Sequence, residues 1–306
     1  HGGFYLACSS MRKSFLQLHI AVLLAGFTGV LGRLITLNEG LIVWYRLLIT
    51  AITLWVLFYA TKRIQKIPLK DIWYLTGAGF ISALHWVFFY ASIKYANVSI
   101  ALVCFSVISF FSSFLEPLIN RVRINKLELL FGLMNVLGIW LIFHFDTTYK
   151  LGIGLGLVAA FFGALFPILL KMKMTRINMQ TVLTWQMTGG FVTLSLVMPL
   201  YLKAFPVATL MPSLTDFLWL LVLAWVCSVI AFQFAMNALK KLSAFTVNLS
   251  YSVEPVYGIV MAFILFKENQ VLNRGFYLGT AVIMSTLVLH MLVLRRNNRK
   301  GVVASG

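Results

Sequence analysis

Long apolar runs alternate with short charged or Pro/Gly-containing segments along almost the whole chain. A membrane-spanning helix needs roughly 20 predominantly apolar residues to cross about 30 Å of hydrocarbon, and each run is close to that length. The pattern therefore predicts an all-α polytopic membrane protein with ten transmembrane helices. The predicted spans are 15–36, 41–60, 72–94, 97–119, 127–145, 151–171, 179–201, 214–239, 243–266 and 274–294.

Basic residues in the connecting segments indicate how the spans are oriented, because short cytoplasmic loops carry an excess of lysine and arginine. With the N-terminus placed inside, the cytoplasmic side holds Arg12, Lys13, Lys62, Arg63, Lys66, Lys70, Arg121, Arg123, Lys126, Lys171, Lys173, Arg176, Lys240, Lys241, Arg295, Arg296, Arg299 and Lys300. The opposite side receives Lys94, Lys150, Lys203, Lys267 and Arg274. The contrast recurs at every loop, and it predicts that both termini are cytoplasmic.

The two halves of the sequence match each other at a shift of 147 positions. The pairs are Ala91 with Ala238, Lys94 with Lys241, Ser99 with Thr246, Leu102 with Leu249 and Gly132 with Gly279. Trp44 and Trp185 also fall at equivalent places. Because five is odd, two five-helix copies insert with opposite orientations, which is the inverted-repeat plan of secondary transporters.

The repeat divides the chain into two predicted units. Residues 11–146 form the first five-helix repeat and 147–295 the second, followed by a basic cytoplasmic tail over 296–306. We expect residues 1–10 to be tag or linker residues ahead of Met11, and we leave them out of the fold prediction.

Composition supports the membrane assignment and argues against a soluble domain, a nucleic-acid-binding protein and an enzyme. The chain is 61% hydrophobic and only 11% charged, which leaves no room for a sizeable soluble domain. The net charge of +17 lies in clusters between apolar runs, so it indicates topology rather than nucleic-acid binding. Cys8, Cys104 and Cys227 are isolated thiols, and no metal, cofactor or disulfide is predicted. Without a nucleotide-binding, hydrolase or metalloprotease motif, an enzyme is not expected.

Three segments resemble the ten-helix EamA-type transporters of the drug/metabolite transporter (DMT) superfamily. They are Tyr90-Ala-Ser-Ile-Lys-Tyr-Ala-Asn-Val-Ser-Ile-Ala, Asn237-Ala-Leu-Lys-Lys-Leu-Ser-Ala-Phe-Thr-Val, and Val253-Glu-Pro-Val-Tyr-Gly followed by Phe266-Lys-Glu. The resemblance implies ten helices around a central cavity and transport of amino acids, nucleobases, cofactor precursors or other small metabolites. The first-half counterpart of Pro255 is Ile108, so the symmetry of the fourth and ninth spans is open.

Two ionisable residues inside predicted spans are candidates for substrate binding, because a charge in hydrocarbon is costly. Arg46 either extends its long side chain to the outer interface, or it anchors an acidic substrate group or pairs with Glu39. Glu254 precedes Pro255, where the helix is expected to be broken near mid-span. It either binds a cationic substrate or a coupling proton, or is a structural carboxylate held by neighbouring hydroxyls.

Further cavity candidates come from the repeat. Trp86 and Tyr90 are i,i+4 neighbours on the third span, and their counterparts Gln233 and Asn237 share the same spacing on the eighth. His85 is a lone histidine in an apolar run, and a buried structural role is the alternative. The remaining candidates, on the ninth span, are Asn248 and Tyr251. For all of these, an aromatic belt or interhelical hydrogen bonds is the alternative interpretation.

The sequence thus predicts a secondary transporter in the inner (cell) membrane that moves a small metabolite by alternating access, with export favoured. A lipid or lipid-linked-sugar translocator is the first alternative, and a non-transporting scaffold or sensor is the second. The expected partners are a small-molecule substrate and membrane lipids, with protons as a candidate coupling ion. Either a monomer or a homodimer is compatible with the sequence.

Overall fold

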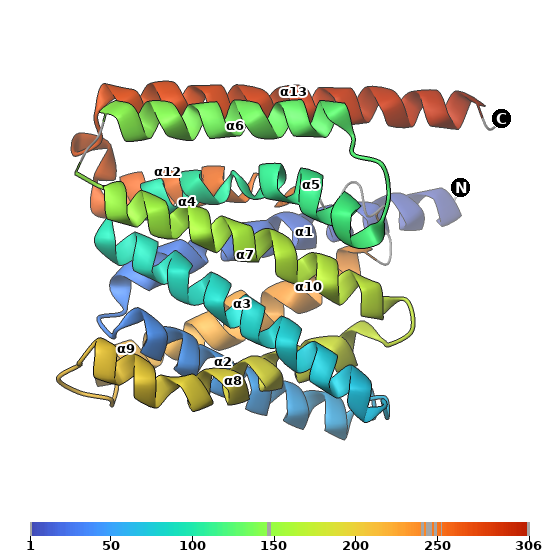
Figure 1. Cartoon of the computed structure of the whole chain (residues 1–306). Helices are drawn as coiled ribbons and strands as arrows, with labels where there is room; N and C mark the ends of the chain where they lie inside the picture. The colour runs from blue at the N-terminus through green and yellow to red at the C-terminus, as the bar shows by residue number, and fades with distance from the viewer. Residues whose placement is uncertain are drawn as a thin grey trace.

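A computed structural model describes residues 2–145, 148–239, 242, 247, 250–251 and 253–304, with side chains described for 13–144, 148–238, 242, 247, 250–251 and 253–293. Within these ranges every regular element is a helix (Figure 1). Nine helical segments among the described residues are long and apolar enough to cross a membrane, and Glu254–Phe266 is a shorter apolar helix. The chain is therefore a multi-pass membrane protein.

The helices follow the predicted spans within a few residues, apart from longer helices at the two ends of the chain and the ninth span, of which Glu254–Phe266 is described as a helix and residues 243–246, 248–249 and 252 lie outside the described residues. The first half contains α1 (Gly2–Leu34), α2 (Glu39–Ala60), α3 (Leu69–Tyr95), α4 (Val98–Phe105), α5 (Ile108–Asn120) and α6 (Lys126–Phe145). The second half contains α7 (Lys150–Met174), α8 (Met179–Ala204), α9 (Leu214–Leu221), the π-helix Val222–Ile230, α10 (Ala231–Leu239), α12 (Glu254–Phe266), a 3₁₀ turn Glu268–Gln270 and α13 (Arg274–Ala304).

The span predicted over 97–119 is present as Val98–Asn120, but its helix is interrupted between α4 and α5. Ser106 N donates to Val103 O and Val107 N to Cys104 O, which are three-residue bonds in place of the four-residue bonds of an α-helix. The carbonyl of Ser106 is satisfied from outside by the side-chain amide of Asn135 on α6, at 3.3 Å. No proline marks this break, so the sequence carries no local signal for it.

The second half repeats this break before α12. Its three bonds are Val253 N to Ser250 O, Val256 N to Val253 O and Tyr257 N to Val253 O, and they match bonds of Val107, Phe110 and Phe111 at a shift of 146 positions. The two halves are thus related by a shift of 146 positions at the break, one fewer than the 147 positions that relate the matching residues in the sequence. Pro255 lies in the first turn of α12, where a missing backbone donor costs no helical hydrogen bond.

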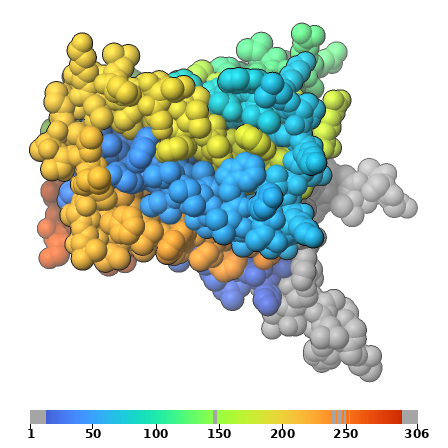
Figure 2. Space-filling view, turned by 90° about the horizontal axis from the view of Figure 1, so that it is seen from below, coloured from blue at the N-terminus to red at the C-terminus, as the bar shows by residue number. Residues whose placement is uncertain are grey.

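Helix packing follows the two-fold relation expected of inverted repeats. Three pairs of corresponding spans pack against each other: the second and seventh through α2 and α8, the fourth and ninth through α4 and α12, and the fifth and tenth through α6 and α13. In addition α1 packs against α10 and α12, as α7 packs against α3, α4 and α5. Figure 1 shows α6 and α13 side by side at one edge, and Figure 2 shows α2 between α8 and the α9–α10 segment.

The two ends of the bundle differ in charge. One end, which we call the basic end, carries both termini and the loops 61–68, 121–125 and 175–178 (Figure 1). The opposite end carries the loops 35–38, 205–213 and 267–273. Arg33 lies in the last turn of α1 and therefore adds one basic residue to the opposite end. The basic end still carries the larger number of lysine and arginine residues.

Small residues bring α3 and α8 into backbone contact. A Cβ atom on Gly79 would lie 2.2 Å from Gln186 O and 2.6 Å from Gly190 N. Gly77 on the same helix faces open space, because a Cβ atom there would meet nothing within 4 Å. Only glycine at position 79 therefore permits this approach.

We predict that Gly79→Ala destabilises the bundle by about 1–3 kcal/mol, because the added methyl group forces two backbones apart. Gly77→Ala is the matched control and should leave stability unchanged or slightly higher, since alanine favours helix. Thermal unfolding of the purified protein in detergent measures both. Equal stability of the two variants would show that the α3–α8 contact is not as close as described.

Candidate functional site

A cavity of about 390 Å³ lies in the middle of the bundle. Its lining comes from α1, α2, α3, α7, α8, the π-helix and α10, together with residues at both helix breaks. The break residues are Phe105, at the end of α4, and Tyr251 and Glu254, at the break before α12. The symmetric breaks thus supply two sides of one central cavity.

Arg46 of α2 reaches into this cavity and is 6% exposed. Its Nε donates to Ser228 Oγ at 3.1 Å and its Nη1 to the Tyr90 hydroxyl at 3.0 Å. The guanidinium also lies 4.3 Å above the ring of Trp86. Arg46 therefore neither extends to the outer interface nor pairs with Glu39, because Nε, Nη1 and the flat face of its guanidinium have partners inside the bundle.

The π-helix Val222–Ile230 creates one of these partners. Ser228 Oγ donates to Leu223 O, five residues earlier, at 2.9 Å and accepts from Arg46. A π-helical stretch is rare and is frequent at functional sites, because the wider turn moves side chains off the regular helical register. Cys227 and Ser228 of this stretch both line the cavity.

Glu254 faces the same cavity from the first turn of α12. A Cβ atom on Gly26 of α1 would lie 3.0 Å from Glu254 O, so α1 passes close behind this turn. The ion pairs among the described residues join Arg33 to Glu268, Lys171 to Glu116 and Lys173 to Asp71. Within this part of the chain, therefore, neither Arg46 nor Glu254 has an ion-pair partner.

The other predicted residues divide into two groups. His85, Trp86 and Tyr251 line the cavity, whereas Tyr90 is fully buried behind it and orients Arg46. His85 Nδ1 lies 2.8 Å from Ala159 O, and its ring is among Phe89, Phe105 and Phe166.

The amide residues are placed differently. Gln233 and Asn237 do not belong to the cavity lining, and Gln233 Nε2 donates to Asn237 Oδ1 at 3.2 Å along the same face of α10. The i,i+4 spacing that Gln233 and Asn237 share with Trp86 and Tyr90 thus brings the two amides into contact with each other and not with the cavity. Asn248 lies outside the described residues.

Sequence reasoning missed the contacts that close the opposite end. Glu268, which is 1% exposed, accepts from Val98 N at 3.1 Å and from Ser99 N at 2.8 Å, and it forms an ion pair with Arg33. The N-terminus of α4 suits a carboxylate because its first N–H groups have no helical acceptor. Glu268 and Val98 are 170 positions apart, so no local pattern joins them.

The loop 35–38 is held at the same end. Asp216 accepts from Thr36 N at 2.8 Å and from Thr36 Oγ1 at 2.7 Å. Lys94 donates to the carbonyl of Leu37, and the Tyr201 hydroxyl donates to Glu39 at 2.9 Å. These contacts connect α1 and α2 to α3, α8 and α9 and close the opposite end with polar bonds.

The cavity extends toward the basic end. Leu183 lies four residues after the start of α8, and Ala235 four residues before the end of α10, and both line the cavity. Among the described residues, polar contacts at the basic end join α7 and α8 to α3, α5 and the loop 61–68. None of these contacts crosses to α1, α10 or α12; α1 and α12 are joined to each other by the Tyr257 hydroxyl, 3.3 Å from His19 Nδ1.

This fold defines a polytopic membrane protein with an internal cavity. The model of the EamA-like transporter family matches residues 12–144 and again residues 150–292. The chain therefore belongs to the EamA-like transporter family, within the DMT superfamily, and carries two copies of its repeat. It is a transporter of small solutes.

Comparison with solved structures supports the same fold, and eighteen chains match. One of them, described only as "Crystal structure of protein", has a TM-score of 0.62 at 15% sequence identity. That match covers 93% of this chain and 99% of the solved one. At this identity the similarity shows the fold alone. No curated protein matches the sequence.

We predict that a cysteine at Ala235 reacts with a small membrane-impermeant thiol reagent applied from the basic end, because this position lines the cavity. The variant Ala238→Cys on the same helix is the control, since Ala238 is 0% exposed and should stay unreactive. Both are made in a chain whose three native cysteines are replaced. Labelling in vesicles of the two orientations measures access, and reaction of Ala235→Cys only from the opposite end would contradict this geometry.

Proposed function

We propose that this chain is a secondary transporter that exports an amino acid, or a similar small zwitterion with an apolar body, across the cytoplasmic membrane. Transport takes place by alternating access, with the substrate bound in the central cavity. The observation that carries the proposal is the pair of opposite charges, Arg46 and Glu254, that face one cavity without an ion-pair partner among the described residues.

Two charged side chains inside the bilayer indicate a function, because each is costly to place there. A charged side chain in the middle of a bilayer costs about 2.5–3.5 kcal/mol on insertion scales, so charges there pair with each other or serve a ligand. Arg46 and Glu254 do not pair with each other within 4.0 Å. A zwitterion with its carboxylate at Arg46 and its ammonium group at Glu254 would neutralise both.

The rest of the cavity suits the apolar part of such a substrate. Aromatic side chains form much of the wall: Trp86, Phe89, Phe105, Phe166 and Phe232. Apolar and aromatic walls with a few placed polar groups are typical of small-molecule sites. This combination favours an amphipathic amino acid over a phosphorylated or highly polar metabolite.

The difference between the two ends supports alternating access. Polar bonds of Glu268, Asp216 and Lys94 close the opposite end, whereas the cavity extends toward the basic end. In an inverted repeat, exchange of conformations between the two halves exchanges which end is open. The Arg33–Glu268 pair joins the end of α12 to α1 and α4, so its release would accompany opening of that end.

The direction follows from the charges of the loops. The positive-inside rule places the basic end in the cytoplasm. The cavity would then face the cytoplasm in this conformation, where a substrate for export enters. Glu254 is the candidate for proton coupling, since it is the cavity's carboxylate.

The test is uptake of a pooled set of labelled amino acids and small metabolites into proteoliposomes, with and without an imposed pH gradient. We predict substrate uptake by the wild type that falls about 10- to 100-fold in Glu254→Gln, because a charge-assisted hydrogen bond contributes about 1.5–3 kcal/mol. Asp71→Asn is the matched control, since Asp71 pairs with Lys173 outside the cavity and should retain uptake.

The pH gradient separates the two energy sources. Gradient-driven accumulation that Glu254→Gln loses indicates proton coupling, whereas uptake that is independent of the gradient indicates a facilitator. Absence of uptake for every member of the pool, with activity toward long-chain lipids instead, would contradict the proposed function and favour a lipid translocator.

A further inference from the structure

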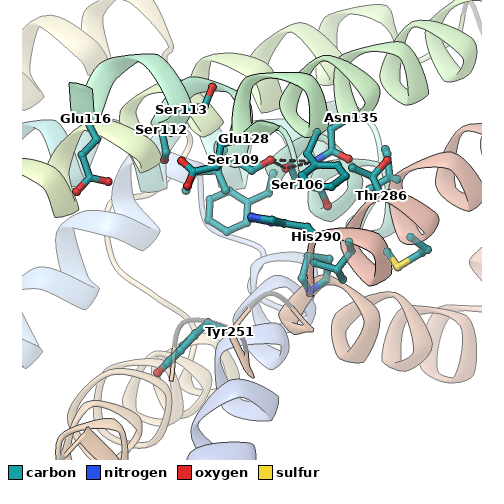
Figure 3. A pocket seen from close by; sticks show the side chains of 17 residues that line it. Ser106, Ser109, Ser112, Ser113, Glu116, Glu128, Asn135, Tyr251, Thr286 and His290 are labelled. Carbon is teal, nitrogen blue, oxygen red and sulfur yellow. Dashed lines mark hydrogen bonds between the residues drawn. The ribbon is translucent and has the colours of Figure 1, made fainter. Parts of the chain in front are cut away.

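A second cavity of about 230 Å³ lies outside the central one, between α5 and α12 on one side and α6 and α13 on the other (Figure 3). Phe105 and Tyr251 line both cavities, so one layer of side chains separates them. None of the charged residues of the central cavity lines this one. It is therefore a distinct pocket with its own chemistry.

One end of this pocket has a buried polar atom without a hydrogen-bond partner among the described residues. Asn135 is 7% exposed, and its Nδ2 donates to Ser106 O at 3.3 Å and to Ser109 Oγ at 2.8 Å. Ser106 O can only accept, so the amide nitrogen must face it and the oxygen must face away. Within the described residues Asn135 Oδ1 is buried without a hydrogen-bond partner. It requires a donor, and the pocket is where a ligand would supply one.

The other end carries carboxylates. Glu116 is paired with Lys171 at 2.8 Å, whereas Glu128 accepts from the neutral amide of Asn125 at 2.9 Å. Glu128 therefore keeps its negative charge uncompensated by any described cation within 4.0 Å. Figure 3 shows the polar side chains along the pocket from Glu116 at one end to Asn135 and Thr286 at the other.

The spacing of these groups sets the length of a ligand. Glu128 and Asn135 are seven residues apart on α6, which corresponds to about 10 Å at the rise of an α-helix. Between the two ends the wall is apolar, with Phe131, Met284 and Leu287. A fitting molecule has a cationic head, an apolar body and a hydrogen-bond donor at its far end.

The polar face of α5 that lines this pocket is not repeated in the second half of the chain. At the shift of 146 positions seen at the helix breaks, Ser109, Ser113 and Glu116 correspond to Pro255, Ile259 and Ala262. The polar face of α5 thus has an apolar counterpart in the second repeat. Because these polar groups occur in one half only, we take them as a sign of a use specific to that half.

We propose that this pocket is a second ligand site, which binds an amphipathic primary amine with its ammonium group at Glu128 and a hydroxyl or amide donor at Asn135 Oδ1. The site is separate from the central cavity. It does not depend on the substrate proposed above, since none of its polar contacts involves Arg46 or Glu254.

Tyramine is a suitable probe, because it has an ammonium group, an aromatic body and a terminal hydroxyl. We expect saturable binding of labelled tyramine to the purified full-length protein. Phenethylamine, which lacks the hydroxyl, and tyrosol, which lacks the ammonium group, should each compete about tenfold more weakly, since each loses one polar contact. This series uses the wild type alone and needs no variant to fold.

Variants locate the binding. Glu128→Gln should weaken tyramine binding about tenfold or more, and Asn135→Leu should reduce the preference for tyramine over phenethylamine. Glu254→Gln should leave this binding unchanged, which separates it from any failure of the proposed transport. Loss of binding in Glu254→Gln with no effect of Glu128→Gln, equal competition by the three compounds, or absence of saturable binding would overturn the proposal.

Discussion

The burial of one guanidinium group, that of Arg46, is the constraint on which the central part of this structure depends. Its charge lies in an apolar bundle without a described carboxylate partner, so neutral groups must hold it. They come from two other parts of the fold: Ser228 of the π-helix, and Tyr90 with Trp86 of α3. The irregular backbone of the eighth span and the aromatic face of the third are therefore parts of one arrangement, which keeps a positive charge exposed to the cavity.

The inverted repeat provides the frame, and departures from its symmetry provide the chemistry. Both halves break their fourth helix with the same hydrogen bonds, and both breaks wall the central cavity. Glu254 stands at one break, whereas the other presents Phe105 and a serine face that leads into the second pocket. The ends are unequal as well, because Glu268 caps α4 at one end only.

Hydropathy, charge bias and internal similarity were sufficient to predict the multi-pass helical fold and the inverted repeat, since each depends on composition over many residues. The family was indicated by the resemblance of three short segments, and the family model confirms it. The breaks were only half predictable: Pro255 indicates one, while the break at Ser106 depends on the amide of Asn135, which is distant in sequence. For the site, rarity of charge inside a span was enough to select Arg46 and Glu254. Their partners, the π-helix, and the capping of α4 by Glu268 result from tertiary contacts, which no local pattern contains.

The central claim is that Arg46 and Glu254 bind the two opposite charges of one substrate. Competition by modified substrates tests it most directly. Once a transported amino acid is known, its methyl ester and its N-acetyl derivative are compared as inhibitors of uptake in the wild type, Arg46→Gln and Glu254→Gln. Binding through both charges predicts a crossed pattern: Arg46→Gln no longer discriminates against the ester, and Glu254→Gln no longer discriminates against the N-acetyl compound. If both variants retained the wild-type discrimination between the three compounds, Arg46 and Glu254 would not be the groups that bind the substrate's charges.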